Sequence, residues 1–559
     1  MADAPEVVVA SGHMVDAADR STPRFPAGEV ERVTREVAAT LRGWNVGPST
    51  TVVCGGARGA DIIVAEQARE LGARVRLCLA APAEQFEQTS VALPGTDWVA
   101  RFRALSAIAD VEVVPPASDP ADDVYSRTNQ RLIEITRSYG GHPHAVIVWN
   151  GAEGDGPGGT RNFVRQLAGG GRTGPVHVID PTPRAYESRQ SAPGPKKLLA
   201  LDGGGIRGVL SLEILRSMEA QLRQRRGSPD LVLADYFDYV GGTSTGAVIA
   251  AALAMGRSVA EVQDRYISLA STVFRKRFLP FRLRSFYPDD QLRSELEDFF
   301  GPGRTLGAPE FRSLVLLVLH NTVTDSAWPL SNCTQAKYNR ADRCLQSPSD
   351  RNLDLSLTEL LRGSTAAPVY FAPQTIRVGS HEFVFQDGGL TPFNNPALLM
   401  YVMATLPEYG LNWRAGPEDL LVVSVGTGSA ASVHPGLRPG KVWLGFNAKN
   451  FPSVFMRGAS VGQDLLARAF GSTRAGEEID REFGARLNPA PAPGGSRFSY
   501  VRYDANLSKE TLQEYGITSS RAQKTIRKLD AVGEMAQLRA IGEKVGRTVD
   551  VADHFRGFL

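Results

Sequence analysis

Three short segments hold the residues of this chain that can do chemistry. Two are glycine-rich, Asp202–Gly208 (Asp-Gly-Gly-Gly-Ile-Arg-Gly) and Gly242–Gly246 (Gly-Thr-Ser-Thr-Gly), and the third is Asp387–Gly389 (Asp-Gly-Gly). A glycine loop presents backbone N–H groups to an oxyanion, and a serine on a sharp turn between glycines is a nucleophile. A carboxylate can take the proton of that serine. Together the three segments predict an acyl-transfer site.

The first glycine loop has two chemical interpretations. It follows the strand-like run Lys196–Leu201 and precedes a helical pattern, so its N–H groups lie at a helix N-terminus, where an anion binds. The spacing of Gly203, Gly205 and Gly208 also fits a dinucleotide fingerprint, which needs a second strand ending in an acid about twenty residues later. Here the helix runs instead into the basic stretch Gln221–Arg226, which favours the oxyanion loop.

Ser244 lies between a strand-like run and a helix of small residues, which is typical of a nucleophile elbow. A serine that only caps a helix fits this position equally well. Asp387 follows another strand-like run, so it can reach the same sheet edge and form a direct Ser–Asp dyad in a site that excludes water. The rival is a triad in the order Ser, Asp, His, which His434 would complete.

The three segments, in this order, resemble the patatin-like phospholipase family. Its pattern combines D-G-G-G-x-R-G, G-x-S-x-G and D-G-G or D-G-A motifs, and all three are present without substitution. Arg362–Pro373, Asn394–Ala397 and Leu421–Gly428 resemble further segments of the family. The similarity extends from about Lys196 to near His554.

The resemblance implies a serine lipid acyl hydrolase of the phospholipase A type, acting at a phospholipid membrane surface. It assigns Ser244 as nucleophile and Asp387 as base. The oxyanion hole would consist of the amides of Gly203, Gly204 and Gly205, with Arg207 steadying the loop. No metal and no cofactor for catalysis are implied.

The length of 559 residues predicts more than one domain. A proline-rich stretch at 181–196 is expected to be a linker between an N-terminal domain at 1–180 and a C-terminal domain at 197–559. Strand and helix patterns alternate on both sides, which indicates α/β folds. We expect a Rossmann-like doubly wound parallel sheet in the first domain and a patatin-like α/β/α layered second domain.

The expected elements are short and regular. In the first domain the strand patterns are Glu6–Ala10, Thr50–Cys54, Arg74–Leu79, Val111–Val114, Ala145–Trp149 and Val176–Ile179. The helical patterns between them span 28–43, 60–71, 98–109, 122–139 and 160–168. In the second domain the strand patterns are Lys197–Leu201, Phe237–Val240, Leu314–Leu319, Phe383–Phe385 and Leu420–Val425.

Charge and cysteine usage argue against several classes of protein. The 62 basic and 60 acidic residues leave a net charge of 62 − 60 = +2, so nothing favours a nucleic-acid partner. The four cysteines form no Cys-x-x-Cys pair, which argues against a zinc site or a disulfide framework. No apolar run reaches the length of a membrane span and no signal peptide is apparent. We therefore expect a cytoplasmic protein that attaches peripherally to the inner membrane when active.

Three glycine-bearing turns follow strands of the first domain, and ligands of open parallel sheets bind at strand ends. The candidate ligand residues are Gly12, Gly55, Gly56, Arg58, Gly59, Gly158, Gly159 and Thr160. Helices that begin near Ala60 and Thr160 offer N–H groups to a phosphate, and Arg58 can add a charge-assisted hydrogen bond. The alternative is that these turns need glycine only for tight connections.

Gly55–Asp61 and Pro157–Thr160 resemble the SLOG group of nucleotide-sensing domains, relatives of the lonely-guy phosphoribohydrolases. Those hydrolases place a catalytic glutamate after the second motif, whereas Arg161 stands here, which favours binding over cleavage. The resemblance implies a small nucleotide as activator of a bacterial antiviral-defence effector, with self-association of the chain. Two alternatives stay open: a ligand-binding scaffold with a vestigial patatin site, and an N-terminal domain that consumes its nucleotide.

The segment 274–287 interleaves aromatic and basic residues. It fits an interfacial patch in which aromatic rings enter the lipid boundary and cations meet anionic headgroups. A surface loop whose aromatic rings turn into the core fits it as well.

Overall fold

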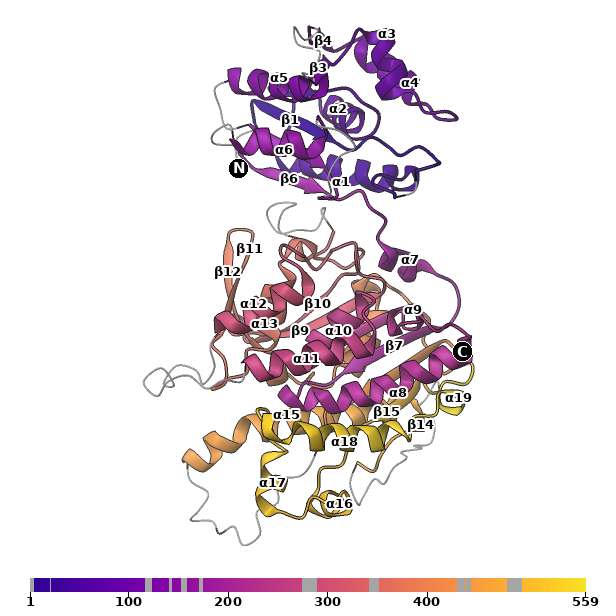
Figure 1. The fold of residues 1–559 in the computed structure, drawn as a ribbon, viewed down its shortest axis with the longest axis vertical. Coiled ribbons are helices and arrows are strands. Elements are labelled where there is room, and N and C mark those ends of the chain that lie inside the picture. Colours follow the sequence, from indigo (N-terminus) through magenta and orange to yellow (C-terminus); the bar gives the residue numbers. More distant parts are fainter. Residues whose placement is uncertain are drawn as a thin grey trace. The chain divides into compact units, whose positions relative to one another are not determined.

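The chain forms two compact units, one up to Pro183 and one from Arg184 onward. The computed structural model describes residues 5–20, 22–115, 123–139, 143–151, 158–169, 174–273, 289–340, 351–429, 438, 444–479 and 495–559 of the 559. Both units are α/β, as the sequence predicts: a parallel sheet with helices in the first and a mixed sheet with helices in the second (Figure 1).

The first unit is built on six parallel strands in the order β4-β3-β2-β1-β5-β6. Their bounds are β1 Val7–Gly12, β2 Thr51–Cys54, β3 Arg74–Leu79, β4 Asp110–Val113, β5 His144–Val148 and β6 Val176–Ile179. The chain runs outward from central β1 to β4 and then returns to the other side of β1. The order therefore changes direction between β1 and β5, which is where open parallel sheets bind ligands.

Helices cover both faces of this sheet: α1 Val30–Gly43, α2 Ala60–Glu70, α4 Trp98–Ser106, α5 Val124–Ser138 and α6 Thr160–Gly169. Alternate residues of β1 serve the two faces, because side chains of a strand point to opposite sides. Val8 belongs to a core with residues of α1 and α2. Val7 and Val9 belong to a second core with residues of α5 and α6. Such burial on both faces is the doubly wound arrangement.

The second unit has a nine-stranded mixed sheet in the order β11-β12-β9-β8-β7-β13-β15-β14, with β10 paired to β9. The strands are β7 Lys196–Leu201, β8 Tyr239–Thr243, β9 Leu314–Asn321, β10 Ser326–Ser331, β11 Gln374–Val378, β12 His381–Asp387, β13 Leu420–Val425, β14 Ser472–Ala475 and β15 Ser499–Tyr503. Strands β7, β8, β9, β13, β14 and β15 run parallel, and β7, β9 and β13 are buried runs of mostly apolar residues.

The helices of the second unit that matter for the site are α8 Gly208–Arg226, α10 Thr245–Ala254, α11 Val259–Val273, α12 Asp289–Phe300, α13 Leu357–Ser364, α15 Leu444–Phe470, α17 Ser520–Thr525 and α18 Met535–Gly546. Helix α8 begins directly after the first glycine loop and α10 directly after Ser244. Helix α18 packs along α8, where Gly542 allows close approach to Leu210. None of the helices in the described part of the chain is long and apolar enough to cross a bilayer.

Strands β8 and β12 share one edge of β9, and this sharing positions the site. Strand β8 pairs with β9 up to the pair Thr243–Val318, and β12 pairs antiparallel with β9 from Asp387–Leu319 onward. Strand β10 occupies the opposite edge of β9. The carboxyl ends of β8 and β12 therefore meet head to head beside β9, one residue pair apart.

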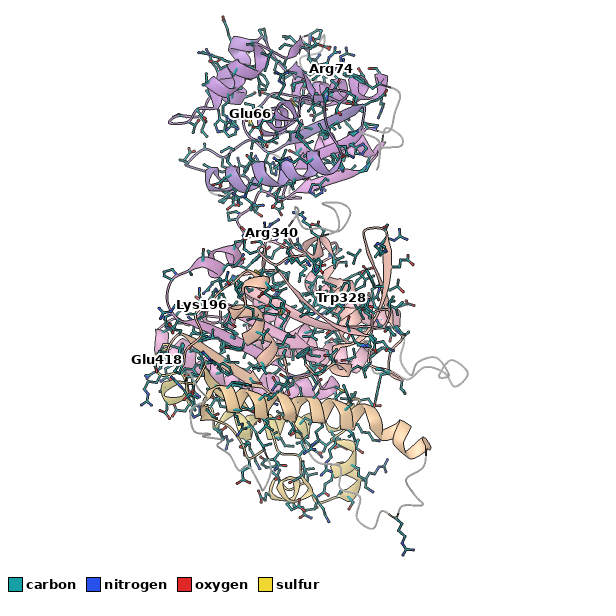
Figure 2. All side chains as sticks on the ribbon, turned by 180° about the vertical axis from the view of Figure 1, so that it is seen from behind. Glu66, Arg74, Lys196, Trp328, Arg340 and Glu418 are labelled. Carbon is teal, nitrogen blue, oxygen red and sulfur yellow. The ribbon has the colours of Figure 1, made fainter. Side chains whose placement is uncertain are left out.

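Aromatic packing holds β12 in this position. The ring of Trp328 on β10, labelled in Figure 2, lies 4.9 Å from the ring of Phe383 and 5.2 Å from that of Phe385. Edge-to-face and tilted pairs at such distances stabilise beyond the area they bury. The strand that ends at Asp387 is thus fixed by aromatic packing as well as by its backbone pairing with β9.

The stretch expected as a linker at 181–196 contains a helix, α7 Ala185–Ser191, and the first residue of β7. Tyr186 of α7 is fully buried, and the indole N–H of Trp413 donates to the carbonyl of Gln190 at 2.9 Å. The composition of the stretch predicts an exposed connection. The stretch instead belongs to the second unit from Arg184 onward, and the buried ring of Tyr186 lies in that part.

Candidate active site

Ser244 stands at the sharp turn between β8 and α10 with φ 56° and ψ −126°. A non-glycine residue rarely adopts this positive φ, so the turn holds backbone strain at the position of the serine. The flanking glycines make the turn possible. A Cβ on Gly242 would overlap the backbone of Gly246, and a Cβ on Gly246 would overlap the carbonyl of Leu201. The elbow predicted from sequence is therefore present.

The head-to-head strands bring Ser244 and Asp387 into direct contact. The hydroxyl Oγ of Ser244 donates to Oδ2 of Asp387 at 2.7 Å, and the N–H of Gly389 donates to Oδ1 at 2.7 Å. Both side chains are buried. Burial raises the pKa of Asp387 from 3.8 to about 6, although the hydrogen bonds from Ser244 and Gly389 oppose the rise. The carboxylate is ionised at neutral pH and can accept the serine proton.

The glycine loop orients two N–H groups by holding the carbonyls that precede them. The hydroxyl of Thr427 donates to the carbonyl of Gly203 at 3.0 Å, and Nε of Arg207 donates to the carbonyl of Gly204 at 3.3 Å. In a trans peptide the C=O and the following N–H point in opposite directions. Within the described residues nothing accepts a hydrogen bond from the N–H of Gly204 or Gly205.

The N–H of Gly203 differs from the other two, because it donates to the carbonyl of Asn394 at 3.1 Å. The carbonyl of Gly205 accepts hydrogen bonds from the hydroxyl of Tyr266 at 2.6 Å and that of Thr245 at 3.0 Å. The loop thus has two N–H groups available to an oxyanion, where the motif predicts three.

The guanidinium of half-buried Arg207 turns back onto the loop. Its Nη1 donates to the carbonyl of Gly428 at 2.8 Å, in addition to the Nε contact with Gly204. Burial lowers the pKa of this guanidinium, and the carboxylates of Asp504 and Asp202 oppose the effect. This geometry is what the predicted steadying role requires.

A buried ion pair anchors the strand that leads into the loop. Arg502 of β15 donates to both oxygens of Asp202, at 2.7 and 2.8 Å, and also to Ser424 Oγ at 2.6 Å. Burial raises the pKa of Asp202 to about 6 while the charge of Arg502 lowers it. A bidentate pair of this kind fixes direction as well as distance. Sequence reasoning missed Arg502, since no motif connects it to a residue 300 positions earlier.

Ser364 was also missed as a site residue, although it lies in a segment that resembles the family. Its hydroxyl accepts the N–H of Ser244 at 3.0 Å and donates to the carbonyl of Val318 at 2.7 Å. It therefore ties the elbow to β9. Thr427 and Asn394 likewise lie in segments noted from sequence, but only the structure shows their contacts with the loop.

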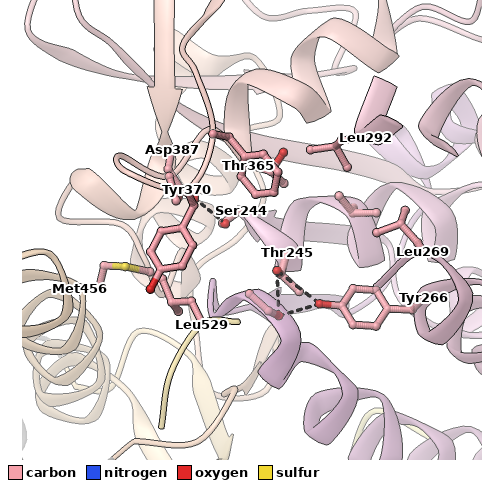
Figure 3. A pocket seen from close by; sticks show the side chains of 14 residues that line it. Ser244, Thr245, Tyr266, Leu269, Leu292, Thr365, Tyr370, Asp387, Met456 and Leu529 are labelled. Atoms are coloured by element: carbon pink, nitrogen blue, oxygen red, sulfur yellow. Dashed lines mark hydrogen bonds between the residues drawn. The ribbon is translucent and has the colours of Figure 1, made fainter. Parts of the chain in front are cut away.

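An apolar cavity of about 620 Å³, including its open mouth, lies over Ser244, Asp387 and Gly205 (Figure 3). The remaining lining residues are Thr245, Val248, Tyr266, Leu269, Leu292, Thr365, Ala367, Tyr370, Phe371, Met456 and Leu529. We call it the main cavity. Its lining suits a hydrocarbon chain next to the Ser–Asp pair.

Two sequence expectations at this site fall outside the described residues: His434 and the basic and aromatic segment 274–287. No histidine of the described ranges lines the main cavity. The described residues also contain no cluster of three or more His, Cys, Asp or Glu side chains that would hold a metal ion.

In the first unit the predicted glycines lie at the carboxyl edge of the sheet, but most meet atoms of their own unit. A Cβ on Gly12 would lie 2.5 Å from the carbonyl of Val148, and one on Gly59, at φ 95°, would lie 2.8 Å from that of His13. Gly55 lies against Asp61, and Gly56, at φ 80°, against the core residue Leu79.

The second predicted turn of this unit is packed in the same way. A Cβ on Gly158 would overlap Asp123 and Tyr125, and the carbonyl of Gly159 accepts the N–H of Asn162 in the first turn of α6. Thr160, the first residue of α6, is buried. The guanidinium of Arg58 donates to the carbonyls of Val15 and Ala92, at 3.0 and 3.3 Å, so it already has backbone partners.

His13 and Asn150 connect the ends of β1 and β5, where the strand order changes direction. Nε2 of His13 lies 2.8 Å from Oδ1 of Asn150, and the N–H of His13 donates to the carbonyl of Val148. Burial lowers the pKa of His13, although the hydrogen bond to Asn150 opposes the effect. Neither side chain was a candidate from sequence, because a single histidine after a strand gives no specific signal.

Comparison with known proteins places the second unit among described relatives. The family model for patatin-like phospholipase matches residues 199–401. The cGAMP-activated phospholipase of Escherichia coli (strain TW11681) is 27% identical over 256 residues, covering 45% of this chain and 67% of that protein. The cGAMP-activated phospholipase of Vibrio cholerae serotype O1 is 28% identical over 361 residues, covering 61% of this chain and 90% of that protein.

Plant and animal proteins match as well. Patatin group J-1 of Solanum tuberosum is 28% identical over 248 residues, covering 42% of this chain and 60% of that protein. The intracellular phospholipase A2 of Caenorhabditis elegans is 32% identical over 249 residues, covering 44% of this chain but only 20% of its own length.

Proposed function

The chain contains a patatin-like phospholipase domain at residues 199–401, and we propose that it hydrolyses carboxylic esters of phospholipids with Ser244 as nucleophile and Asp387 as general base. Relatives that share the domain are phospholipases and patatins, so the domain is that of a lipid acyl hydrolase. The observation that carries the proposal is the 2.7 Å hydrogen bond from the buried Ser244 hydroxyl to Asp387 beside an apolar cavity.

The first half of the reaction forms an acyl-enzyme. Ser244 Oγ attacks the ester carbonyl carbon while its proton passes to Oδ2 of Asp387. The N–H groups of Gly204 and Gly205 stabilise the oxygen that becomes negative, and each such donor contributes roughly 10²–10³-fold in related chemistry. The bond to the alcohol oxygen then breaks as Asp387 gives the proton to that oxygen.

The second half returns the free enzyme. A water molecule gives a proton to Asp387 and attacks the acyl carbon, and the same two N–H groups stabilise the second oxyanion. The bond to Ser244 Oγ then breaks, Oγ regains a proton from Asp387, and the fatty acid leaves. A pKa of about 6 suits Asp387 for both directions of proton transfer near neutral pH.

The test is hydrolysis of p-nitrophenyl butyrate and of phosphatidylcholine by the purified chain and three variants. Ser244→Ala and Asp387→Asn are expected to lose roughly 10³-fold or more in kcat/KM. His434→Ala is expected to keep most of the activity, with circular dichroism and Tm as the control for folding. An inactive His434→Ala together with an active Asp387→Asn would overturn the Ser–Asp dyad.

We further propose that a nucleotide-derived ligand controls this hydrolysis. Two of the relatives are named cGAMP-activated phospholipases, and the strand order of the first unit changes direction between β1 and β5, where open parallel sheets bind ligands. The SLOG-like character of this unit, its binding of a nucleotide, a role in antiviral defence and self-association of the chain remain predictions from the sequence.

The Vibrio cholerae match adds a rival location for such a ligand. It covers 90% of that protein but 61% of this chain, so much of this chain has no counterpart in a relative named for cGAMP activation. Hydrolysis is therefore compared for the full chain and for residues 184–559, each with and without cGAMP and with bacterial nucleotide extracts. Activation of the full chain alone supports the first unit as sensor. Activation of both forms places the sensor in the second unit, and mass spectrometry of the nucleotide separates binding from consumption.

A further inference from the structure

Two hydroxyl groups converge on one backbone oxygen of the glycine loop. The buried phenol of Tyr266 on α11 donates to the carbonyl of Gly205 at 2.6 Å, and the hydroxyl of Thr245 at the start of α10 donates to the same carbonyl at 3.0 Å (Figure 3). Burial raises the pKa of the Tyr266 phenol, so this group stays a donor at neutral pH. Neither hydroxyl takes part in the proton transfers proposed above.

Gly205 needs outside support because it offers an oxyanion donor from a flexible part of the backbone. With φ 57° and no Cβ, its two flanking peptide planes can rotate at little steric cost. The plane that follows it contains the carbonyl of Gly205 and the N–H of Ile206, which donates to the carbonyl of Leu529 at 2.8 Å. Hydrogen bonds at both ends keep this carbonyl from turning toward the oxygen that becomes negative in the reaction, where it would repel that charge.

Gly208, the last glycine of the loop motif, leaves room for both hydroxyl-bearing side chains. A Cβ on Gly208 would lie 2.3 Å from Cγ2 of Thr245 and 3.0 Å from the phenol oxygen of Tyr266. Tyr266 comes from a helix that packs against α8 and α10, so the core of the second unit holds its hydroxyl against the loop. The absence of a side chain at position 208 thus serves the contacts with Gly205.

We propose that Tyr266 is a positioning residue of the oxyanion hole, which holds the carbonyl of Gly205 together with Thr245 and so keeps the N–H of Gly205 aligned with the reacting ester. Tyr266 acts through the loop and does not touch the reacting atoms. The loop motif gives no sign of it, since the tyrosine lies 61 positions after Gly205 on another helix. The proposal rests on the proposed function of the same site.

The experiment measures kcat and KM for p-nitrophenyl butyrate in Tyr266→Phe, Thr245→Val and the double variant. Tyr266→Phe removes one hydroxyl and is expected to lower kcat about tenfold with KM unchanged, because one donor to the carbonyl remains. The double variant removes both donors and is expected to lose roughly 10²-fold, about the effect of one oxyanion donor. Tyr186→Phe is the matched control, since it removes a buried phenol that donates to the carbonyl of Gly307 at 3.2 Å outside the site, and it is expected to keep the wild-type kcat.

Inhibition by an alkyl trifluoromethyl ketone separates positioning from folding. Ser244 Oγ adds to the ketone carbon, the serine proton passes to Asp387, and the ketone oxygen becomes an oxyanion, so the adduct imitates the transition state. Its Ki is expected to rise about tenfold in Tyr266→Phe, in parallel with the loss of kcat, whereas the Ki of the methyl ketone with the same chain is expected to stay unchanged. A smaller fraction of folded enzyme would lower kcat and leave both Ki values as they are.

Two results would overturn the proposal: an unchanged Ki of the trifluoromethyl ketone in Tyr266→Phe, or an equal loss of kcat in Tyr186→Phe. The proposed function is read from the wild-type chain and Ser244→Ala. Hydrolysis that does not depend on Ser244 would overturn the proposed function and the role of Tyr266 with it. Ser244-dependent hydrolysis at the wild-type rate in Tyr266→Phe and in the double variant would overturn the role of Tyr266 alone.

Discussion

Both units place glycine-rich turns where parallel strands end, yet the turns differ in what surrounds them. In the second unit the loop of Gly203–Gly205 presents two N–H groups next to Ser244 and a cavity. In the first unit Asp61 accepts the N–H of Ala57 in its own loop, and Arg58 donates to the backbone carbonyls of Val15 and Ala92 in neighbouring segments. A glycine-rich turn therefore indicates only that something approaches the backbone closely. The groups around the turn decide whether that partner is a ligand or the chain itself.

The prediction with the largest expected effect concerns Asp387 of the second unit, where one substitution should lower activity but raise stability. Asp387→Asn is expected to abolish hydrolysis while raising the free energy of unfolding at pH 7.5. The pKa of Asp387 rises from 3.8 to about 6 on folding, so its protonation favours the folded state. That contribution is present below pH 3.8 and is lost as the pH rises through about 6, which amounts to about 3 kcal/mol.

The measurement is urea unfolding of the wild-type chain and of Asp387→Asn at pH 4 and pH 7.5, monitored by a probe of the second unit. Relative to the wild type, the free energy of unfolding of the variant should increase from pH 4 to pH 7.5. Equal pH dependence of the two proteins would show that Asp387 does not titrate near 6.

The next prediction compares Gly205 of the second unit with Gly59 of the first. Gly205→Ala is expected to lower kcat/KM for p-nitrophenyl butyrate roughly 10²-fold, because the new Cβ would overlap the carbonyl of Leu529 and displace an oxyanion donor. Gly59→Ala in the first unit carries a comparable conformational strain at φ 95°. It is expected to leave basal ester hydrolysis unchanged. Loss of basal activity in both variants would mean that the two units are coupled without any ligand.

The pH profile gives a further test of the second unit. In the proposed mechanism the ionised form of Asp387 is the base, so kcat/KM should rise with pH through about 6 and then become level. The profile is measured with a neutral ester so that the substrate does not titrate. A rise centred near pH 7 or above would favour a histidine as the base.

The prediction with the smallest expected effect compares Arg207 and Arg58, whose guanidinium groups both donate hydrogen bonds to backbone carbonyls. Arg207→Lys removes the fork that contacts Gly204 and Gly428 and is expected to cost about tenfold in kcat, with KM little changed. Arg58→Lys in the first unit is the matched control and should not alter basal hydrolysis. An equal loss from both substitutions would show that the carbonyl contacts matter for folding alone.

Much of the architecture follows from local pattern. All six strands of the first unit lie within about two residues of their predicted bounds, because each carries a short run of β-branched or apolar residues. Only the central strands are buried on both faces; the edge strands β4 and β6 leave valines exposed. Strands β10, β11, β14 and β15 were missed. Whether a residue of these strands is buried depends on the neighbouring strands, which the local sequence does not reveal. In β15, for example, Arg502 stands at a buried position only because Asp202 is there to pair with it.

The residues of the candidate site also fall into those that the sequence predicts and those that only the fold brings together. Ser244, Asp387 and the glycine loop carry motifs that can be read one segment at a time. The donors that hold the loop, Thr427 and Arg502, become visible only when three strands are placed side by side. Likewise, the N–H of Gly203 looks free in the motif, and only the fold shows that Asn394 accepts it.

The shared edge of β9 affects when the active site forms during folding. Ser244 and Asp387 are 143 residues apart, and their contact depends on β8 and β12 both finding the correct register on one strand. A slip of one residue in the β9–β12 pairing would turn Asp387 to the opposite face of the sheet. Contacts between such distant segments form slowly, since a long loop must close first. Labelling of Ser244 by a fluorophosphonate should therefore recover later than helix content during refolding, which makes the nucleophile a reporter of completed strand order.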